Sequence, residues 1–203
     1  MFETIINQYK SIPNWQISIE IIVFIFGILS VYFAKKENVL VYPTGIICTI
    51  LSVYIMFNAK YYADMSINIY YSIMSIYGWF QWKKITNGEV LSISRTNMKE
   101  KIIGVILFLI TAIICIYIYK FFNYKLQINN YLDIFTTSLF FTAMWYMAKK
   151  KIENWTLWII GDFIVTPIYA YRGLGMLALQ YLIFTVLAIM AYLEWRKHLQ
   201  NRI

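Results

Sequence analysis

The sequence has little cysteine, histidine and charge, and each shortage excludes a class of protein. Its 203 residues include two cysteines and one histidine, which supply neither a disulfide framework nor the clustered spacing of a metal site. Cys48 and Cys115 stand alone within apolar runs, where we expect them to pack. There is no glycine-rich Walker A loop, and there are no paired acids within the apolar runs, so neither ATP hydrolysis nor acid–base hydrolysis is indicated. We therefore expect a protein that is not an enzyme and that uses no cofactor or metal.

Apolar residues take the place of the missing charge. Charged residues make up 14% of the chain, hydrophobic residues 61% and aromatic residues 19%, whereas a soluble domain has about 25% charged residues. A membrane-spanning helix needs about 20 mostly apolar residues, and runs of about this length recur along the chain. They cover 17–34, 40–57, 63–82, 101–122, 131–149, 154–171 and 175–195. The sequence thus predicts an all-α integral membrane protein with seven transmembrane helices in a lipid bilayer.

The basic residues behind the net charge of +8 lie in the loops between these runs, which argues against a nucleic-acid partner. The two alternate sides hold 13 and 5 lysines and arginines, and the positive-inside rule places the richer side in the cytoplasm. We therefore expect the N-terminus outside and the C-terminus inside. The composition, rich in Lys, Ile and Asn, suggests a bacterial source, so the expected location is the inner membrane of a bacterial cell. The richer side has Lys35, Lys36, Lys83, Lys84, Arg95, Lys99, Lys101, Lys149, Lys150, Lys151, Arg196, Lys197 and Arg202; the other has Lys10, Lys60, Lys120, Lys125 and Arg172.

The chain also repeats itself with a period of 113–116 residues. Ala34-Lys-Lys-Glu-Asn38 resembles Ala148-Lys-Lys-Lys-Ile-Glu-Asn154, and Gly78-Trp-Phe-Gln-Trp-Lys-Lys84 resembles Ala191-Tyr-Leu-Glu-Trp-Arg-Lys197. Each copy holds three spans, and the extra span between them restores the orientation. This predicts two parallel three-helix repeats joined by a linker helix, a 3+1+3 arrangement of the kind found in SWEET-type transporters.

These features divide the chain into six predicted segments. They are an N-terminal interfacial segment (1–16), a first three-helix repeat (17–84), a cytoplasmic loop (85–100), a linker helix (101–122), a second three-helix repeat (131–197) and a cytoplasmic tail (198–203).

The sixth apolar run carries the strongest candidate site. Asp162 lies at its middle, where a charged side chain costs about 2.5–3.5 kcal/mol on insertion scales. Residues at spacings of three and four share one helix face, and such a stripe can stack an aromatic ring and pair with a positive charge. The stripe consists of Trp155, Trp158, Asp162, Thr166 and Tyr169. The alternative is that the tryptophans anchor the helix at the interface and Asp162 bonds to a neighbouring helix; for Trp155 the two interpretations are balanced.

A second candidate group lies near the outer ends of the third and seventh runs. Asn68 and Gln180 hold nearly equivalent repeat positions, and Tyr71 shares a face with Asn68. Their amides suit a carboxamide or sugar edge, or equally a bridge between helices. Under a shift of 116 residues, by contrast, the Trp158 and Asp162 positions of the second repeat fall on Tyr42 and Ile46. The first repeat is therefore expected to be nearly apolar where the second is polar.

Three motifs carry a resemblance to a known family. Glu153-Asn154-Trp155-Thr156-Leu157-Trp158, Tyr77-Gly78-Trp79-Phe80-Gln81-Trp82 and Lys60-Tyr61-Tyr62-Ala63-Asp64 resemble the PnuC family of nicotinamide riboside transporters. In that family the paired tryptophans line the ligand site, which carries over to Trp155 and Trp158. Members often have Asn at the position of Asp162 and Gln at the position of Asn68.

The resemblance implies a SWEET-like seven-helix fold, a homotrimer, and uptake of nicotinamide riboside by facilitated diffusion, with a cytoplasmic kinase trapping the ligand. Close relatives carry thiamine, so thiamine stays open as the alternative small-molecule substrate. A receptor with the same topology would leave the parallel repeat unexplained, and a membrane enzyme would lack catalytic residues. Transport is the function that the sequence favours.

Overall fold

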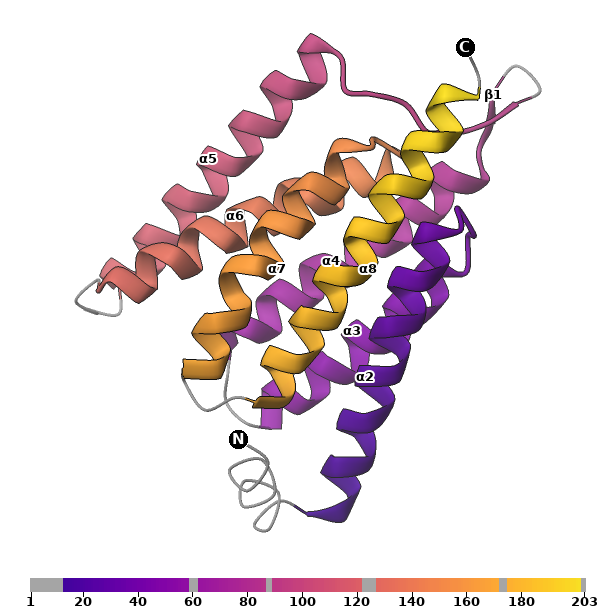
Figure 1. The fold of residues 1–203 in the computed structure, drawn as a ribbon. Helices are drawn as coiled ribbons and strands as arrows, with labels where there is room; N and C mark the ends of the chain where they lie inside the picture. The colour runs from indigo at the N-terminus through magenta and orange to yellow at the C-terminus, as the bar shows by residue number, and fades with distance from the viewer. Residues whose placement is uncertain (1–12, 59–61, 87–88, 122–126, 172–174, 202–203) are drawn as a thin grey trace. The chain divides into compact units, whose positions relative to one another are not determined.

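The computed structural model describes residues 13–58, 62–86, 89–121, 127–171 and 175–201, coloured along the chain in Figure 1. Most of the predicted N-terminal segment 1–16 and part of the tail 198–203 lie outside these ranges. Five of the basic residues in the charge count also lie outside the described residues, namely Lys10, Lys60, Lys125, Arg172 and Arg202.

All seven predicted runs form helices. They are α2 (Asn14–Lys35), α3 (Val41–Asn58), α4 (Tyr62–Lys83), α5 (Met98–Phe121), α6 (Ile128–Ala148), α7 (Glu153–Tyr171) and α8 (Gly175–Gln200). The ends agree with the predicted runs to within three residues, except that α8 continues five residues past Trp195. The all-helical prediction is confirmed.

Four of the described helices are long and apolar enough to cross a membrane by length and composition, namely α2, α3, α5 and α8 from Leu177 onward. The helices α4, α6 and α7 have 22, 21 and 19 residues, which suffices in length, but they carry more polar side chains. Several of these polar side chains are buried, among them Ser138, Asn154 and Asp162. Polar groups within a membrane are tolerated when they face the protein interior, so spans through these three helices stay a prediction.

The chain divides into two compact units at Leu91 and Ser92, within the predicted 85–100 loop. In the first unit α2 packs against α3 and α3 against α4. In the second, each of the helices α5 to α8 packs against the next one along the chain (Figure 1). The candidate stripe therefore lies on the middle helix of α6, α7 and α8.

The loop between the units contains structure that the sequence interpretation missed. Strand β1 (Ile85–Thr86) pairs antiparallel with β2 (Glu89–Val90). The intervening sequence Asn87-Gly88 is typical of two-residue hairpin turns, so the sequence carries a signal for this hairpin.

A short segment before α5 is bonded to the turn between α6 and α7; we call this segment, residues 92–97, the strap. The Ser94 N–H donates to the Lys150 carbonyl at 3.1 Å, and the Ile152 N–H donates to the Ser94 carbonyl at 3.0 Å. The Thr96 N–H donates to Glu153 Oε2 at 3.0 Å. Just beyond the strap, Glu100 forms an ion pair with Lys151 at 2.9 Å. The start of α7 is thus held in place by neighbouring segments of the second unit.

The same turn follows the first helix of each predicted three-helix repeat, α2 in the first unit and α6 in the second. Glu37 and Lys150 both adopt the left-handed conformation, with φ of 52° and 50°. Four backbone hydrogen bonds around Glu37 recur around Lys150 at a shift of 113 residues. In the first unit, the carbonyls of Ala34, Phe33, Asn38 and Val39 accept from the N–H groups of Glu37, Asn38, Val41 and Tyr42, respectively. In the second unit, the carbonyls of Met147, Tyr146, Lys151 and Ile152 accept from the N–H groups of Lys150, Lys151, Asn154 and Trp155. The local structure therefore repeats, with a defined register.

An aromatic pair repeats in the same register. The rings of Tyr42 and Trp82 meet edge to face at 5.2 Å and 86°, and those of Trp155 and Trp195 at 5.4 Å and 87°. The expected shift of 116 residues between the second helices of the repeats is therefore wrong. A count of 116 follows from aligning Asn38 with Asn154, but the hydrogen bonds align Asn38 with Lys151. The corrected shift of 113 places Asp162 opposite Thr49 and Trp158 opposite Gly45.

Candidate functional site

The centre of the candidate site is Asp162, which is 2% exposed on α7. Its carboxyl oxygen Oδ1 has no hydrogen-bond partner within the described part of the chain. Nor does any ion pair among the described residues involve it. A buried charge without a partner is costly, and the alternative that Asp162 bonds to a neighbouring helix finds no support in these contacts.

Aromatic rings from three helices surround this part of α7. Phe140 of α6 stacks on Trp158 with ring centres 5.1 Å apart and planes at 23°. Phe140 also lies nearly parallel to Tyr181 of α8 at 6.3 Å, and Tyr181 stacks on Tyr169 at 5.3 Å. We call these four residues, Phe140, Trp158, Tyr181 and Tyr169, the aromatic row. It connects two of the predicted site residues through two that were not predicted.

Gly161 makes the close approach of α6 possible. A Cβ atom at this position would collide with the ring of Phe140, whose Cδ1 atom would lie 2.9 Å away. The absence of a side chain therefore lets the Phe140 ring lie against the α7 backbone, one turn from Trp158. Phe140 and Tyr181 were missed because ring stacking across helices leaves no spacing pattern. A comparison of the two repeats at a shift of 113 residues would have indicated Phe140. Phe140 and Trp158 of the second repeat correspond to Gly27 and Gly45 of the first, so two large rings stand where the first repeat has glycines.

Trp155 lies apart from the aromatic row. It is 1% exposed and packs edge to face on Trp195, and the first unit has the same arrangement in Tyr42 and Trp82. This equivalence supports the packing interpretation for Trp155. The Nε1 atom of Trp155 nevertheless has no hydrogen-bond acceptor among the described residues. The Oδ1 atom of the neighbouring Asn154, which is fully buried, likewise has no hydrogen-bond donor among them.

The remaining predicted site residues are half-buried. Thr166 donates its hydroxyl to the Asp162 carbonyl at 2.7 Å, so its proton is engaged within the helix and its oxygen can still accept a hydrogen bond. Gln180 directly precedes Tyr181 on α8. Asn68 and Tyr71 lie on α4 in the first unit, where the Asn68 carbonyl accepts a hydrogen bond from Ser72. At a shift of 113 residues between the repeats, Asn68 corresponds to Tyr181. The positions of Asn68 and Gln180 in the two repeats therefore differ by one residue.

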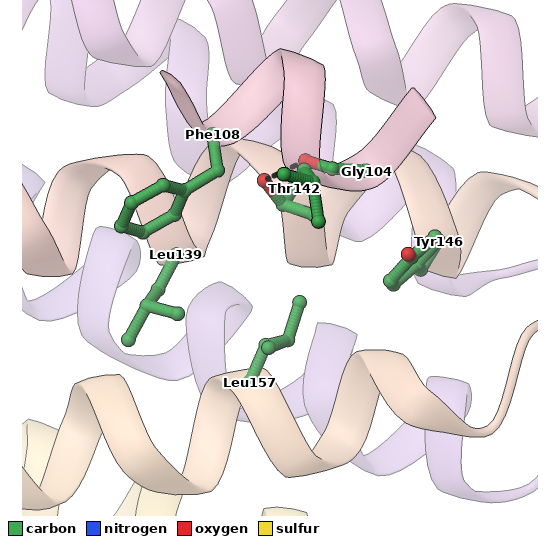
Figure 2. A pocket seen from close by; sticks show the side chains of 7 residues that line it. Gly104, Phe108, Leu139, Thr142, Tyr146 and Leu157 are labelled. Atoms are coloured by element: carbon green, nitrogen blue, oxygen red, sulfur yellow. Dashed lines mark hydrogen bonds between the residues drawn. The ribbon is translucent and has the colours of Figure 1, made fainter. Parts of the chain in front are cut away.

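A small hollow elsewhere in the second unit is separate from these residues. Its volume is about 180 Å³, and Gly104, Val105, Phe108, Leu139, Thr142, Tyr146 and Leu157 line it. Figure 2 shows apolar side chains around it, with Thr142 bonded to the Gly104 carbonyl. Sites for small organic ligands usually measure about 300–1,000 Å³, and no predicted site residue lines this hollow. No group of three potential metal ligands occurs among the described residues.

Comparisons with known proteins assign the family. The family model described as nicotinamide mononucleotide transporter matches residues 17–197. The chain belongs to this transporter family. The resemblance noted in the sequence is thereby confirmed, and the protein is a membrane transporter.

Relatives in the family agree with this assignment over most of their length. The nicotinamide riboside transporter PnuC of Escherichia coli strain K12 is 24% identical over 208 residues, covering 91% of this chain and 87% of the relative. PnuC of Neisseria mucosa is 24% identical over 182 residues, covering 84% and 69%. A crystal structure of the vitamin B3 transporter PnuC matches with a TM-score of 0.72 and 20% identity, covering 98% of this chain and 87% of that one. The fold of the family is therefore shared.

Proposed function

We propose that this protein takes up nicotinamide riboside across the bacterial inner membrane by facilitated diffusion. The observation that carries the proposal is a buried carboxylate, Asp162, whose Oδ1 atom has no partner among the residues that the structure describes, on the same helix as two rings of the aromatic row. Nicotinamide riboside has a flat cationic ring that suits such a row, and relatives that cover most of this chain are named for its transport.

The charge distribution favours the riboside over the mononucleotide in the family's description. A phosphate is usually held by arginine or lysine. No lysine or arginine occurs within α6 or α7, and those of α8 lie at its C-terminal end from Arg196 onward. The phosphate of a mononucleotide would add negative charge to a site built around Asp162, and this is unfavourable in a medium of low dielectric constant.

The wider mechanism follows the sequence interpretation. Two parallel three-helix repeats would form one pathway, with the N-terminus outside and the C-terminus in the cytoplasm. Trp158, Asp162 and Tyr169 would hold the ring, while Asn68, Tyr71, Gln180 and Thr166 would read the carboxamide or ribose edge. A cytoplasmic kinase would prevent return of the solute by phosphorylating it, and three copies of the chain would assemble as a homotrimer.

Thiamine remains the second candidate because its ring is also flat and cationic. Calorimetry of the purified protein with each solute separates the two. We expect binding of nicotinamide riboside to exceed that of thiamine at least tenfold. Stronger binding of thiamine would reverse the assignment, and binding of neither would refute both.

Uptake into vesicles tests the mechanism. Facilitated diffusion predicts that nicotinamide riboside equilibrates without accumulating, and that collapse of the proton gradient leaves the initial rate unchanged. Accumulation that disappears with the gradient would instead indicate ion coupling. Phe163→Ala is a suitable control variant in both assays, since Phe163 neighbours Asp162 on α7 but is 72% exposed.

A further inference from the structure

We propose that the apolar hollow between α5, α6 and α7 holds part of one acyl chain of an anionic phospholipid, phosphatidylglycerol, whose phosphate lies beside Lys101 and Lys149. The hollow is separate from the candidate solute site, so the proposal does not depend on which solute the protein carries. It requires only that these helices lie in a membrane, as those of a membrane transporter do.

The hollow suits hydrocarbon and not a polar solute. Phe108 of α5, Leu139 of α6 and Leu157 of α7 line it (Figure 2), and its lining residues include no charged side chain. The hydroxyls of Thr142 and Tyr146 both donate to backbone carbonyls of α5, at 3.4 and 3.3 Å. An apolar cavity of about 150 Å³ can stay dry and bind benzene. The volume of about 180 Å³ therefore suits a short stretch of acyl chain.

The edge of the hollow is open to the surroundings of the helix. Val105 lines the hollow and is 59% exposed. Ile102, Ile106 and Leu109 of the same helix are about half exposed, and α5 is among the described helices that are long and apolar enough to cross a membrane. An acyl chain of the adjoining lipid can therefore enter the hollow without crossing a polar surface.

Two lysines extend the lining faces toward one end of the helices. Lys101 lies three residues before Gly104 on α5, and Lys149 lies three residues after Tyr146 at the end of α6. Residues at this spacing share a helix face. Neither lysine forms a salt bridge with a described residue. Both ammonium groups can therefore bind an anion beside the hollow.

This end of the second unit suits an anionic head group in charge and in depth. The segments 98–101 and 149–153 hold five lysines and two glutamates, and the positive-inside rule predicts that they lie on the cytoplasmic side. Basic pockets between membrane helices on that side bind anionic head groups. Lys149 Nζ lies over the Trp145 ring, 4.9 Å from its centre, and tryptophans concentrate at the head-group level. Phosphatidylcholine would match the hollow but not the charge.

Native mass spectrometry of the full chain in detergent tests the head group, with phosphatidylglycerol or phosphatidylcholine of identical acyl chains added. We expect the wild type to bind phosphatidylglycerol at least fivefold more tightly, about the effect of one lysine near an anionic surface. In Lys101→Gln/Lys149→Gln the two lipids should bind within twofold of each other. Lys83→Gln is the matched control and should keep the preference, because Lys83 lies over the Trp79 ring at 5.1 Å in the first unit. Lys101→Gln alone, at an exposed residue, repeats the test if the double variant unfolds.

A second pair of variants tests the hollow itself. Val105→Phe places a ring at its edge and should weaken binding of both lipids at least fivefold. Ile106→Phe is the control, because Ile106 is the next residue of α5 but does not line the hollow. Both side chains are well exposed, so both variants should keep the wild-type melting temperature in detergent alone.

Equal binding of the two lipids by the wild type would overturn the proposal, and so would an equal loss of preference in Lys83→Gln. Identical effects of Val105→Phe and Ile106→Phe would also overturn it, because they would indicate a non-specific layer of lipid. If Val105→Phe changes the mass of the oligomer and leaves lipid binding unchanged, a second copy of the chain covers the hollow and the proposal fails. The proposed solute is tested separately and is unaffected by these outcomes.

Discussion

The two units of this transporter share a turn and a packing pair, but they differ at the positions between. Where the first unit has Gly45 and Thr49, the second has Trp158 and Asp162. In the first unit a hydroxyl pair satisfies the polar side chain within the protein. In the second, a buried carboxyl oxygen has no partner among the described residues. The comparison teaches that one copy of a duplicated scaffold can satisfy a buried polar side chain internally while the other, at the equivalent position, carries the residue on which the proposed solute site depends.

The glycines make the same contrast. A Cβ atom at Gly45 would approach the Ser30 hydroxyl at 3.1 Å and the Ser75 hydroxyl at 3.6 Å, so small groups fill this part of the first unit. The equivalent position in the second unit carries the indole of Trp158 stacked on Phe140. Aromatic faces suited to a ring-shaped solute therefore occur in the second copy, where the first copy has close helix contacts.

The largest effect is expected from removing the ring at the centre of the contrast. Trp158→Ala should weaken binding of nicotinamide riboside about ten- to hundredfold, since stacking of a base on an aromatic side chain contributes about 1–3 kcal/mol. Calorimetry measures the loss, and Trp158→Phe should recover part of it. Trp15→Ala is the control, because Trp15 lies in the first unit and is 48% exposed. Unchanged binding in Trp158→Ala would remove the aromatic row from the site.

A second pair of variants adds one methyl group to each unit. Gly161→Ala would displace Phe140, and Gly78→Ala would displace Tyr42. Each should destabilise the protein by about 1–3 kcal/mol, as overpacking does, which thermal unfolding detects. Only Gly161→Ala should also weaken solute binding, because only it disturbs the aromatic row. Equal effects of both variants on binding would erase the proposed difference between the units.

A smaller effect is expected when the hydroxyl pair of the first unit is broken. Thr49→Val removes the bond to Ser72 and should cost about 0.6 kcal/mol, the average for a hydrogen bond between membrane helices. Solute affinity should stay within twofold of the wild type, measured by calorimetry. A large loss of affinity would mean that the first unit contributes to the site at this position as well.

The last effect, on stability alone, is expected from the ion pair just beyond the strap. Glu100→Gln breaks the ion pair with Lys151, whose side chains are 14% and 13% exposed. Ion pairs near the surface contribute about 0.2–1 kcal/mol, so the melting temperature should fall slightly, and 1 M salt should reduce the difference between variant and wild type. A difference that is independent of salt would assign the stability to the Asn97–Glu100 helix cap instead.

The helices could be predicted from the sequence because long apolar runs leave few alternatives to a helix in a membrane. Asp162 could also be singled out, since its cost in an apolar run is independent of tertiary detail. The register of the repeat could not be predicted, because Lys150 and Lys151 belong to a turn whose left-handed residue is visible only in the backbone. Phe140 was likewise hidden, since its role depends on how closely α6 approaches Gly161.

The strap has a practical consequence for dissecting the molecule. Residues 92–97 are covalently continuous with the hairpin but bonded through Ser94 and Thr96 to the start of α7. If the chain is expressed as two separate halves, the division should therefore fall between Leu91 and Ser92. The C-terminal fragment then keeps the hydrogen bonds between the strap and the start of α7. A cut after Asn97 would leave those donors and acceptors on the wrong polypeptide, and complementation between the fragments should fail.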